Sequence, residues 1–167
     1  FGDGVNGTLQ AKLPIATLAA GARFGSVNGY HYWAVAGSVY MQSGIQIGPV
    51  VINGFGGGVA YNMQIAKVDS AQISHPTPPG SILPEVDLTP REGDYVFTAQ
   101  VFLALFRPQT LNANLALSAD ISSSGGLQAI ALDGGGYVFS DNPPASNPKA
   151  IVRVEPMHMV YNLPDET

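Results

Sequence analysis

Alternation of apolar and polar residues dominates the chain and predicts strands rather than helices. The clearest stretch runs from Leu111 to Ile121, where every second residue is Leu, Ala or Ile. The residues between them are mainly Asn, Ser and Asp, which is typical of a half-buried antiparallel strand with one wet face. A second alternating stretch, 152–161, is interrupted by Pro156, which indicates an edge strand or a bulge.

Other segments are apolar on both faces. Segments 32–42 and 95–106 carry aromatic or aliphatic residues at both odd and even positions. Such strands are covered on both sides, or they lie against lipid or a neighbouring subunit. Taken together, the patterns predict strands at 5–12, 15–24, 30–42, 45–53, 57–67, 94–106, 111–121, 126–133, 135–140 and 150–162.

Segment 15–23 is the one stretch whose apolar spacing also fits a helix, and Pro14 would suit the first position of that helix. The segment is short, and Gly21 lies near its end. Because the segments on either side alternate like strands, we favour a strand here too.

Turn signals separate these segments. Three Asn-Gly pairs, at 6–7, 28–29 and 53–54, predict hairpin turns, because both central residues of a type I′ turn need positive φ. The glycine triplet 56–58 predicts a bulge or tight bend joining two strands. It lacks the Lys and Ser/Thr that follow the glycines of a phosphate-binding loop.

Prolines interrupt the strands at two places. Residues 69–92 contain five prolines, which forbid a continuous ladder of hydrogen bonds, and a second break lies at 141–148. The longer break divides a strand block at 1–68 from a strand block at 93–167. We therefore predict a single all-β domain over 1–167, an antiparallel meander that forms a sandwich or a long curved sheet with Pro-rich loops. Since the chain begins with Phe1, we expect it to be a fragment of a larger protein.

Composition narrows the classes of function. Charged residues make up 11% of the 167 residues and apolar residues 46%, a balance that argues against disorder. The formal net charge is −5 and Lys and Arg form no cluster, so nucleic acid and anionic membrane surfaces are not expected partners. There is no cysteine, which excludes disulfides and thiolate zinc sites.

Catalytic and metal-binding patterns are missing from the sequence. The histidines His31, His75 and His158 have no ligand spacing, and no nucleophile elbow of the form G-x-S-x-G occurs. Asp133-Gly134 and Asp141-Asn142 offer oxygen atoms to calcium, but they do not match the EF-hand template, and Asp-Gly is a turn signal in its own right. We expect neither a cofactor, nor a metal, nor an enzyme.

One carboxylate cluster borders the longer Pro-rich segment. Its members are Glu85, Asp87, Glu92 and Asp94, with Arg91 among them. Paired carboxylates could serve glycoside hydrolysis if they were held across a cleft. The intervening arginine favours a solvated, salt-bridged loop instead.

Tyr30, Tyr32 and Trp33 are the candidate ligand-binding residues, because aromatic side chains on an exposed strand face stack on sugars or fill a partner's pocket. Cross-strand packing within the core is the alternative, and we favour it.

Three segments carry a resemblance to known proteins. They are Asn53-Gly-Phe-Gly-Gly-Gly-Val-Ala-Tyr-Asn-Met63, Ser122-Ser-Ser-Gly-Gly-Leu127 and Met159-Val-Tyr-Asn-Leu-Pro-Asp-Glu-Thr167. Together they resemble very long, Gly-rich, uncharacterised bacterial cell-envelope or secreted proteins. The resemblance implies an extended β-rich segment of a large surface protein, with no catalytic residues to carry over.

These observations predict a non-catalytic structural or interaction segment of a bacterial envelope protein, extracellular or on the cell surface. Its partners would be further copies of itself, assembled into filaments or a surface layer, or other surface proteins. Two alternatives stay open. One is a carbohydrate- or ligand-binding β module with a glycan partner, and the other is a piece of a transmembrane β-barrel.

Overall fold

The computed structural model describes residues 4–66, 88–105, 111–138 and 152–163. This part of the chain contains eight strands and no helix. The strands are β1 (Gly4–Lys12), β2 (Ala16–Val27), β3 (Tyr30–Ile47), β4 (Val50–Ile65), β5 (Leu88–Leu105), β6 (Leu111–Ser122), β7 (Gly126–Val138) and β8 (Val152–Asn162).

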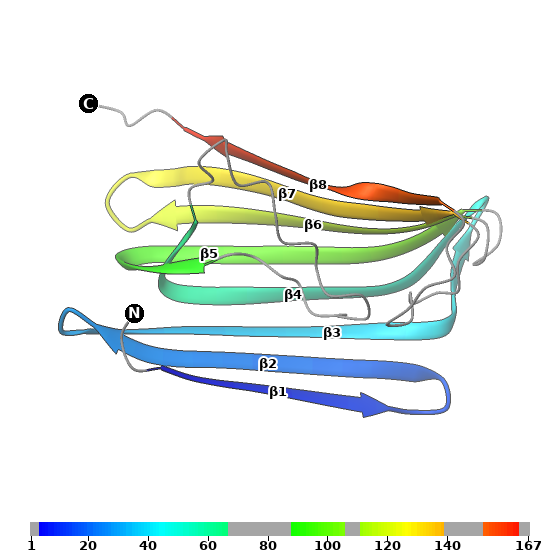
Figure 1. Ribbon diagram of the computed structural model, residues 1–167, viewed down its shortest axis with the longest axis horizontal. Helices are drawn as coiled ribbons and strands as arrows, with labels where there is room; N and C mark the ends of the chain where they lie inside the picture. Colours follow the sequence, from blue (N-terminus) through cyan, green and yellow to red (C-terminus); the bar gives the residue numbers. More distant parts are fainter. Residues whose placement is uncertain (1–3, 67–87, 106–110, 139–151, 164–167) are drawn as a thin grey trace.

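All eight strands belong to one sheet in which each strand pairs antiparallel with the next one along the chain (Figure 1). The pairing of β4 with β5 joins the two predicted strand blocks in this sheet. The sheet is not closed, and β1 and β8 are its edges. The predicted all-β antiparallel meander is therefore confirmed in its form as a long curved sheet, not as a sandwich.

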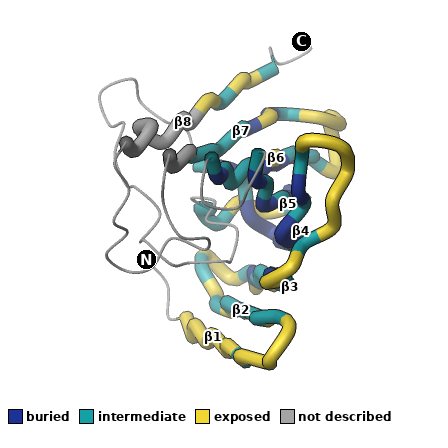
Figure 2. Tube along the Cα trace, turned by 90° about the vertical axis from the view of Figure 1, so that its right-hand side faces the viewer, coloured by how far each residue is buried: buried dark blue, intermediate teal, exposed yellow. Residues whose placement is uncertain are grey.

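The sheet bends into an arc, which Figure 2 shows along the strands. Successive residues of β5 alternate between the two faces, so Val96, Phe102 and Ala104 are buried whereas Tyr95 and Phe97 are exposed. Since side chains on the inside of an arc shield one another from solvent, the buried series lies on the concave face. The exposed series lies on the convex face.

Glycines in β4 allow the concave face to pack tightly. Gly56 lies between β3 and β5, and a Cβ atom there would come within 2.8 Å of the Ser38 Cβ and 2.9 Å of the Gly37 carbonyl oxygen. At Gly54, a Cβ atom would collide with the Val39 carbonyl oxygen. The missing side chains let Tyr40 and Phe102 meet edge to face, with ring centroids 5.7 Å apart at 88°.

Of the three Asn-Gly pairs, only Asn28-Gly29 forms a hairpin turn, with φ of 49° and 86°. Asn6-Gly7 lies inside β1 and pairs with β2, and Asn53-Gly54 lies inside β4, at a bulge. Those two turn predictions are wrong because the local signal gives way to cross-strand pairing. The β3–β4 hairpin turns at Gly48-Pro49 instead, after a bulge near Gly44 in β3.

Two predicted strand breaks are also absent. The glycine triplet 56–58 continues β4 without a bend between separate strands, and Asp133-Gly134 lies within β7 rather than in a turn. Segment 15–23 is extended and mostly within β2, as favoured over the helix. Glycine allows many backbone conformations without imposing one, so it stays extended where both neighbouring strands form hydrogen bonds with it.

Candidate functional site

The convex face carries an unbroken band of apolar side chains. One row across the sheet consists of Val39, Phe55, Val101 and Leu115, and the rows beside it have the same character. Among the described residues of β1 to β6, no convex position between the Trp33 row and the opposite strand ends carries a charged or amide side chain. This sheet face is as apolar as a protein core.

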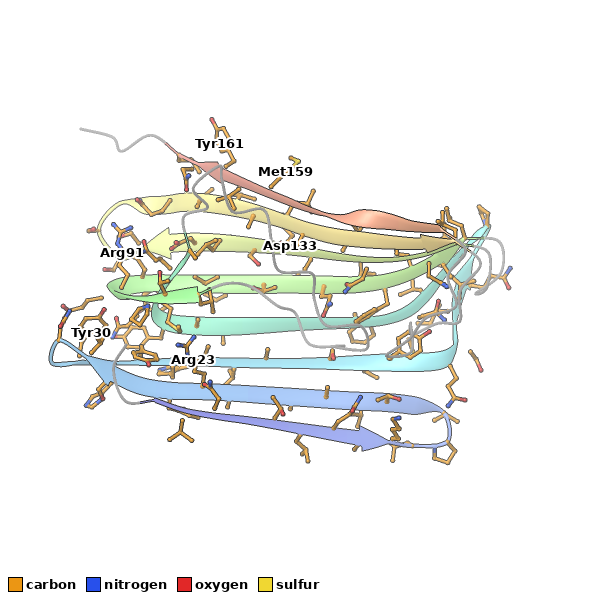
Figure 3. All side chains as sticks on the ribbon, in the orientation of Figure 1. Arg23, Tyr30, Arg91, Asp133, Met159 and Tyr161 are labelled. Atoms are coloured by element: carbon orange, nitrogen blue, oxygen red, sulfur yellow. The ribbon has the colours of Figure 1, made fainter. Side chains whose placement is uncertain are left out.

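That band is nevertheless open to its surroundings. Phe55 is 54% exposed and Leu117 is 52% exposed, although both lie in the middle of the sheet. Figure 3 shows Met159 and Tyr161 projecting outward from β8. The other large exposed apolar residues of this face are Val5, Leu9, Leu18, Phe24, Val35, Ile45, Ile47, Tyr95, Phe97, Leu127 and Ile130. Monomeric soluble proteins rarely expose a continuous apolar surface of this extent.

An aromatic row borders the band on one side. Phe24 pairs with Trp33, Trp33 with Tyr61, and Tyr61 with Tyr95, across four consecutive strands. The ring centroids of Trp33 and Tyr61 are 6.1 Å apart, and those of Tyr61 and Tyr95 are 5.1 Å apart. Trp33 is the single tryptophan of the chain.

Polar side chains follow directly beyond the aromatic row. Ser26 and His31 form a cross-strand pair whose Oγ and Nδ1 atoms are 2.7 Å apart, and both residues are exposed. On β4 the convex face changes from apolar to polar side chains at a bulge formed by Asn62, which has a left-handed φ of 55°. After this bulge the alternation is reversed, and Gln64 accepts a hydrogen bond of 2.9 Å from Arg91.

The reversal at Asn62 sends apolar side chains to the opposite face. Met63 and Ile65 are 0% and 4% exposed and pack with Tyr32 and Val96 in the main core cluster. Asn62 holds the bulge in place, because its side chain donates to the His31 carbonyl oxygen at 2.6 Å and accepts from the Gly93 N–H at 2.8 Å. The apolar band therefore has a defined border at this end.

The concave face is polar in its middle. Thr98 and Ser118 share a hydrogen bond of 2.9 Å, and Gln100 donates to Asn114 at 2.8 Å. Ser118, Gln100 and Asn112 are all buried. This corrects the prediction that the polar series of 111–121 faces water, because the arc of the sheet encloses the polar face and leaves the apolar face outside.

A charged group lies at the aromatic end of the concave face. Arg91 forms an ion pair of 3.1 Å with Asp94, whose side chain is 2% exposed. Asp120 nearby is also buried and accepts a hydrogen bond from the backbone N–H of Ile65. Burial raises the pKa of Asp120, the Ile65 hydrogen bond and Arg91 lower it, and Asp94 raises it. Arg91 does pair with a member of the predicted acidic cluster, but Asp94 is buried rather than solvated, and Glu85 and Asp87 lie outside the described residues.

A cavity of about 310 Å³ opens over the concave face between β1 and β5. Its lining includes the small residues Ala34, Gly58 and Ala60 and one charged residue, Arg23. The Arg23 guanidinium carbon lies 5.7 Å from the centre of the Tyr32 ring. The cavity is thus mainly apolar, with a single cation and the polar side chains of Asn6, Thr8 and Thr98.

The structure divides the three predicted ligand-binding residues between two faces. Tyr32 is 3% exposed and belongs to the concave core, as the packing alternative had it, whereas Trp33 lies in the convex aromatic row. Tyr30 is half-buried at the start of β3. Ligand binding by these residues stays a prediction, but they do not form one common surface.

The predicted absence of a metal site concerns three histidines in different places. His31 lies on the convex side near the Asn28-Gly29 turn, His158 pairs with Asp133 in the β7–β8 ladder, and His75 lies outside the described residues, as does Asp141. Within the described ranges, no group of three or more His, Asp or Glu residues could hold a metal ion.

Comparisons with known proteins found no relative of this chain. No family model, no curated protein and no solved structure matches it. No helix among the described residues is long and apolar enough to cross a membrane.

The sequence pattern predicts which residues form the convex band, but it does not predict that this face is the exposed one. Alternation alone predicts which side chains share a face, and the usual expectation puts the apolar face inside. Asn112, Ser118 and Asp120 are buried on one side of one strand, but a polar series of this kind equally fits a strand that faces water, so the sequence carries no local signal of the inversion.

Proposed function

We propose that this chain is a non-catalytic structural segment of a cell-envelope protein, and that its convex face lies in the hydrocarbon of a lipid bilayer. The observation that carries the proposal is the exposed apolar band, which has no charged or amide side chain at the convex positions of β1 to β6 between the Trp33 row and the opposite strand ends. Closed sheets that cross membranes alternate between an apolar face towards lipid and a polar face inside, and the strands of this open sheet alternate in the same way.

The length of the band supports this assignment. A membrane-crossing strand needs about 9–11 residues. The convex apolar positions run from Trp33 to Met41 on β3, from Tyr95 to Leu105 on β5 and from Leu111 to Ile121 on β6, and each stretch has that length.

The aromatic row supports it further. Trp and Tyr concentrate at the level of the lipid headgroups, where one part of the ring is apolar and the other is wet. Here Trp33, Tyr61 and Tyr95 lie at one border of the band, and Ser26 and His31 follow immediately outside it.

Curvature favours lipid over a second copy of the chain as the cover. Two convex surfaces touch along a line and leave most of each face open, whereas lipid chains conform to any outline. Self-association into filaments or a surface layer remains the second candidate, because an exposed apolar face of this size also drives assembly in water.

The test uses the fluorescence of Trp33, the single tryptophan. The protein is refolded with phosphatidylcholine vesicles whose acyl chains carry bromine either near the headgroup or near the chain end. We expect a blue shift, and stronger quenching by the lipid brominated near the headgroup. An unquenched Trp33, with the protein floating free of vesicles, would refute the proposal. Growth of light scattering without lipid would then support self-association.

A further inference from the structure

The concave cavity has the features of a small-molecule site. It measures about 310 Å³, and its floor consists of residues with little or no side chain, Ala34, Gly58 and Ala60. Thr8 and Thr98 contribute hydroxyl groups to the lining. Ligand sites typically combine a mainly apolar hollow with a few placed polar groups.

Arg23 is held in place on this cavity by a specific packing arrangement. Gly25 pairs with Tyr32 across β2 and β3, and a Cβ atom at Gly25 would collide with the Tyr32 ring. The ring therefore lies over the glycine, and the Arg23 guanidinium is placed over the ring at 5.7 Å. Tyr32 is 3% exposed, so this platform is fixed by the core beneath it.

The charge of Arg23 is not neutralised within the described part of the chain. The ion pair found there joins Arg91 to Asp94, and no hydrogen bond to the Arg23 guanidinium occurs among the described residues. Asp94, Asp120 and Asp133 lie on β5 to β7, whereas Arg23 lies on β2. A guanidinium that faces an apolar hollow without a carboxylate partner can bind an anion in two parallel hydrogen bonds.

We propose that this cavity binds a small organic carboxylate, with the carboxylate on Arg23 and an apolar body over the Ala34–Gly58–Ala60 floor. The carboxylate matches the planar guanidinium, and the small floor residues leave room for an aliphatic chain. The site does not rest on the proposed lipid contact, because it uses the opposite face of the sheet.

Isothermal titration of the folded protein with hexanoate tests the site, and 1-hexanol serves as the neutral ligand of the same chain length. We expect hexanoate to bind and 1-hexanol to bind at least about tenfold more weakly, because a hydrogen bond to a charged group is lost. Hexanoate that releases no heat, or 1-hexanol that binds equally well, would overturn the proposal.

Arg23→Gln is the direct variant and Lys12→Gln its matched control, since both remove one positive charge and Lys12 is exposed at the end of β1. We expect R23Q to weaken hexanoate binding at least about tenfold and K12Q to leave it unchanged. Equal loss in both variants would mean that only overall charge matters, and the site would be rejected.

Two further variants keep the test informative if R23Q unfolds. Arg23→Lys retains the charge without the planar fork, and we expect intermediate affinity. Gly25→Ala displaces the Tyr32 ring while Arg23 remains, and we expect weaker binding with unchanged far-UV circular dichroism. Wild-type affinity in both variants would rule out the Tyr32–Arg23 platform.

Discussion

The carboxylate of Asp120 on β6 accepts a hydrogen bond of 3.0 Å from the backbone N–H of Ile65, at the end of β4. The two residues belong to strands that are not neighbours in the sheet. This contact therefore ties the strand end beyond the Asn62 bulge to the concave face of the second strand block.

Asp120 makes stability depend on pH. Burial raises its pKa in the folded protein above the unfolded value of about 3.9, so the folded state binds more protons between those two pKa values. Stability is expected to fall as the pH rises through that window. Asp120→Asn keeps an acceptor for Ile65 without the charge, and urea denaturation from about pH 4 to pH 7 should show a flatter dependence.

The exposed Glu92 supplies the control for this measurement. Glu92→Gln removes one carboxylate outside the buried group, and we expect its stability to follow pH as in the wild type. An unchanged slope in D120N would show that Asp120 does not titrate in this range.

The variant Leu117→Lys tests whether the convex face contacts lipid or water. Leu117 is 52% exposed, so a lysine there is tolerated if water surrounds it. In hydrocarbon, a lysine near the middle of the bilayer costs about 2–4 kcal/mol. We expect L117K to lower the vesicle-bound fraction in a flotation assay, while Glu92→Lys, beyond the aromatic row, leaves it unchanged. Equal binding of both variants would contradict the lipid contact.

Gly56→Ala tests the tight packing of the arc. The new Cβ would lie 2.8 Å from the Ser38 Cβ and 2.9 Å from the Gly37 carbonyl oxygen, so the strands must shift. We expect a loss of about 1–3 kcal/mol in the free energy of unfolding by urea, as for other overpacked sites. Gly7→Ala is the control, because nothing lies within 4 Å of its added Cβ.

Asn62 combines a backbone role with a side-chain role, and two variants distinguish them. Asn62→Gly keeps the left-handed φ at no cost but loses the bonds to His31 and Gly93. Asn62→Ala loses the same bonds and also pays about 1–2 kcal/mol for the left-handed conformation. We expect both variants to be less stable than the wild type in urea denaturation, with N62A the less stable. Equal stability of the two would argue against backbone strain at this position.

How far the sequence predicts the fold can be judged from particular residues. Alternation identified the strands around Leu111–Ile121 and the antiparallel meander, because the side-chain period is local. It could not say that the Asn112 side of β6 is enclosed, since the direction in which a sheet bends depends on all its strands. Likewise Asn53-Gly54 has the local signature of a turn, but its neighbours on β3 and β5 keep the backbone extended.

The candidate site was less accessible to prediction than the fold. Tyr32 and Trp33 are adjacent in sequence, and period two alone sends them to opposite faces. The sequence could not predict which side chains these two residues contact. Trp33 meets Tyr61 and Tyr32 meets Arg23 only through the register of β2, β3 and β4. The Arg23 cavity depends on five strands and has no local signature.

The two edge strands of the sheet, β1 and β8, differ in how regular their backbones are. β1 is nine residues long, contains no proline and pairs with β2 without a bulge, so its outer edge offers a regular row of backbone donors and acceptors. β8 carries Pro156, which has no N–H to donate, beside an irregularity in its pairing with β7. The backbone groups along β1 therefore form a regular row, whereas those along β8 are interrupted at Pro156.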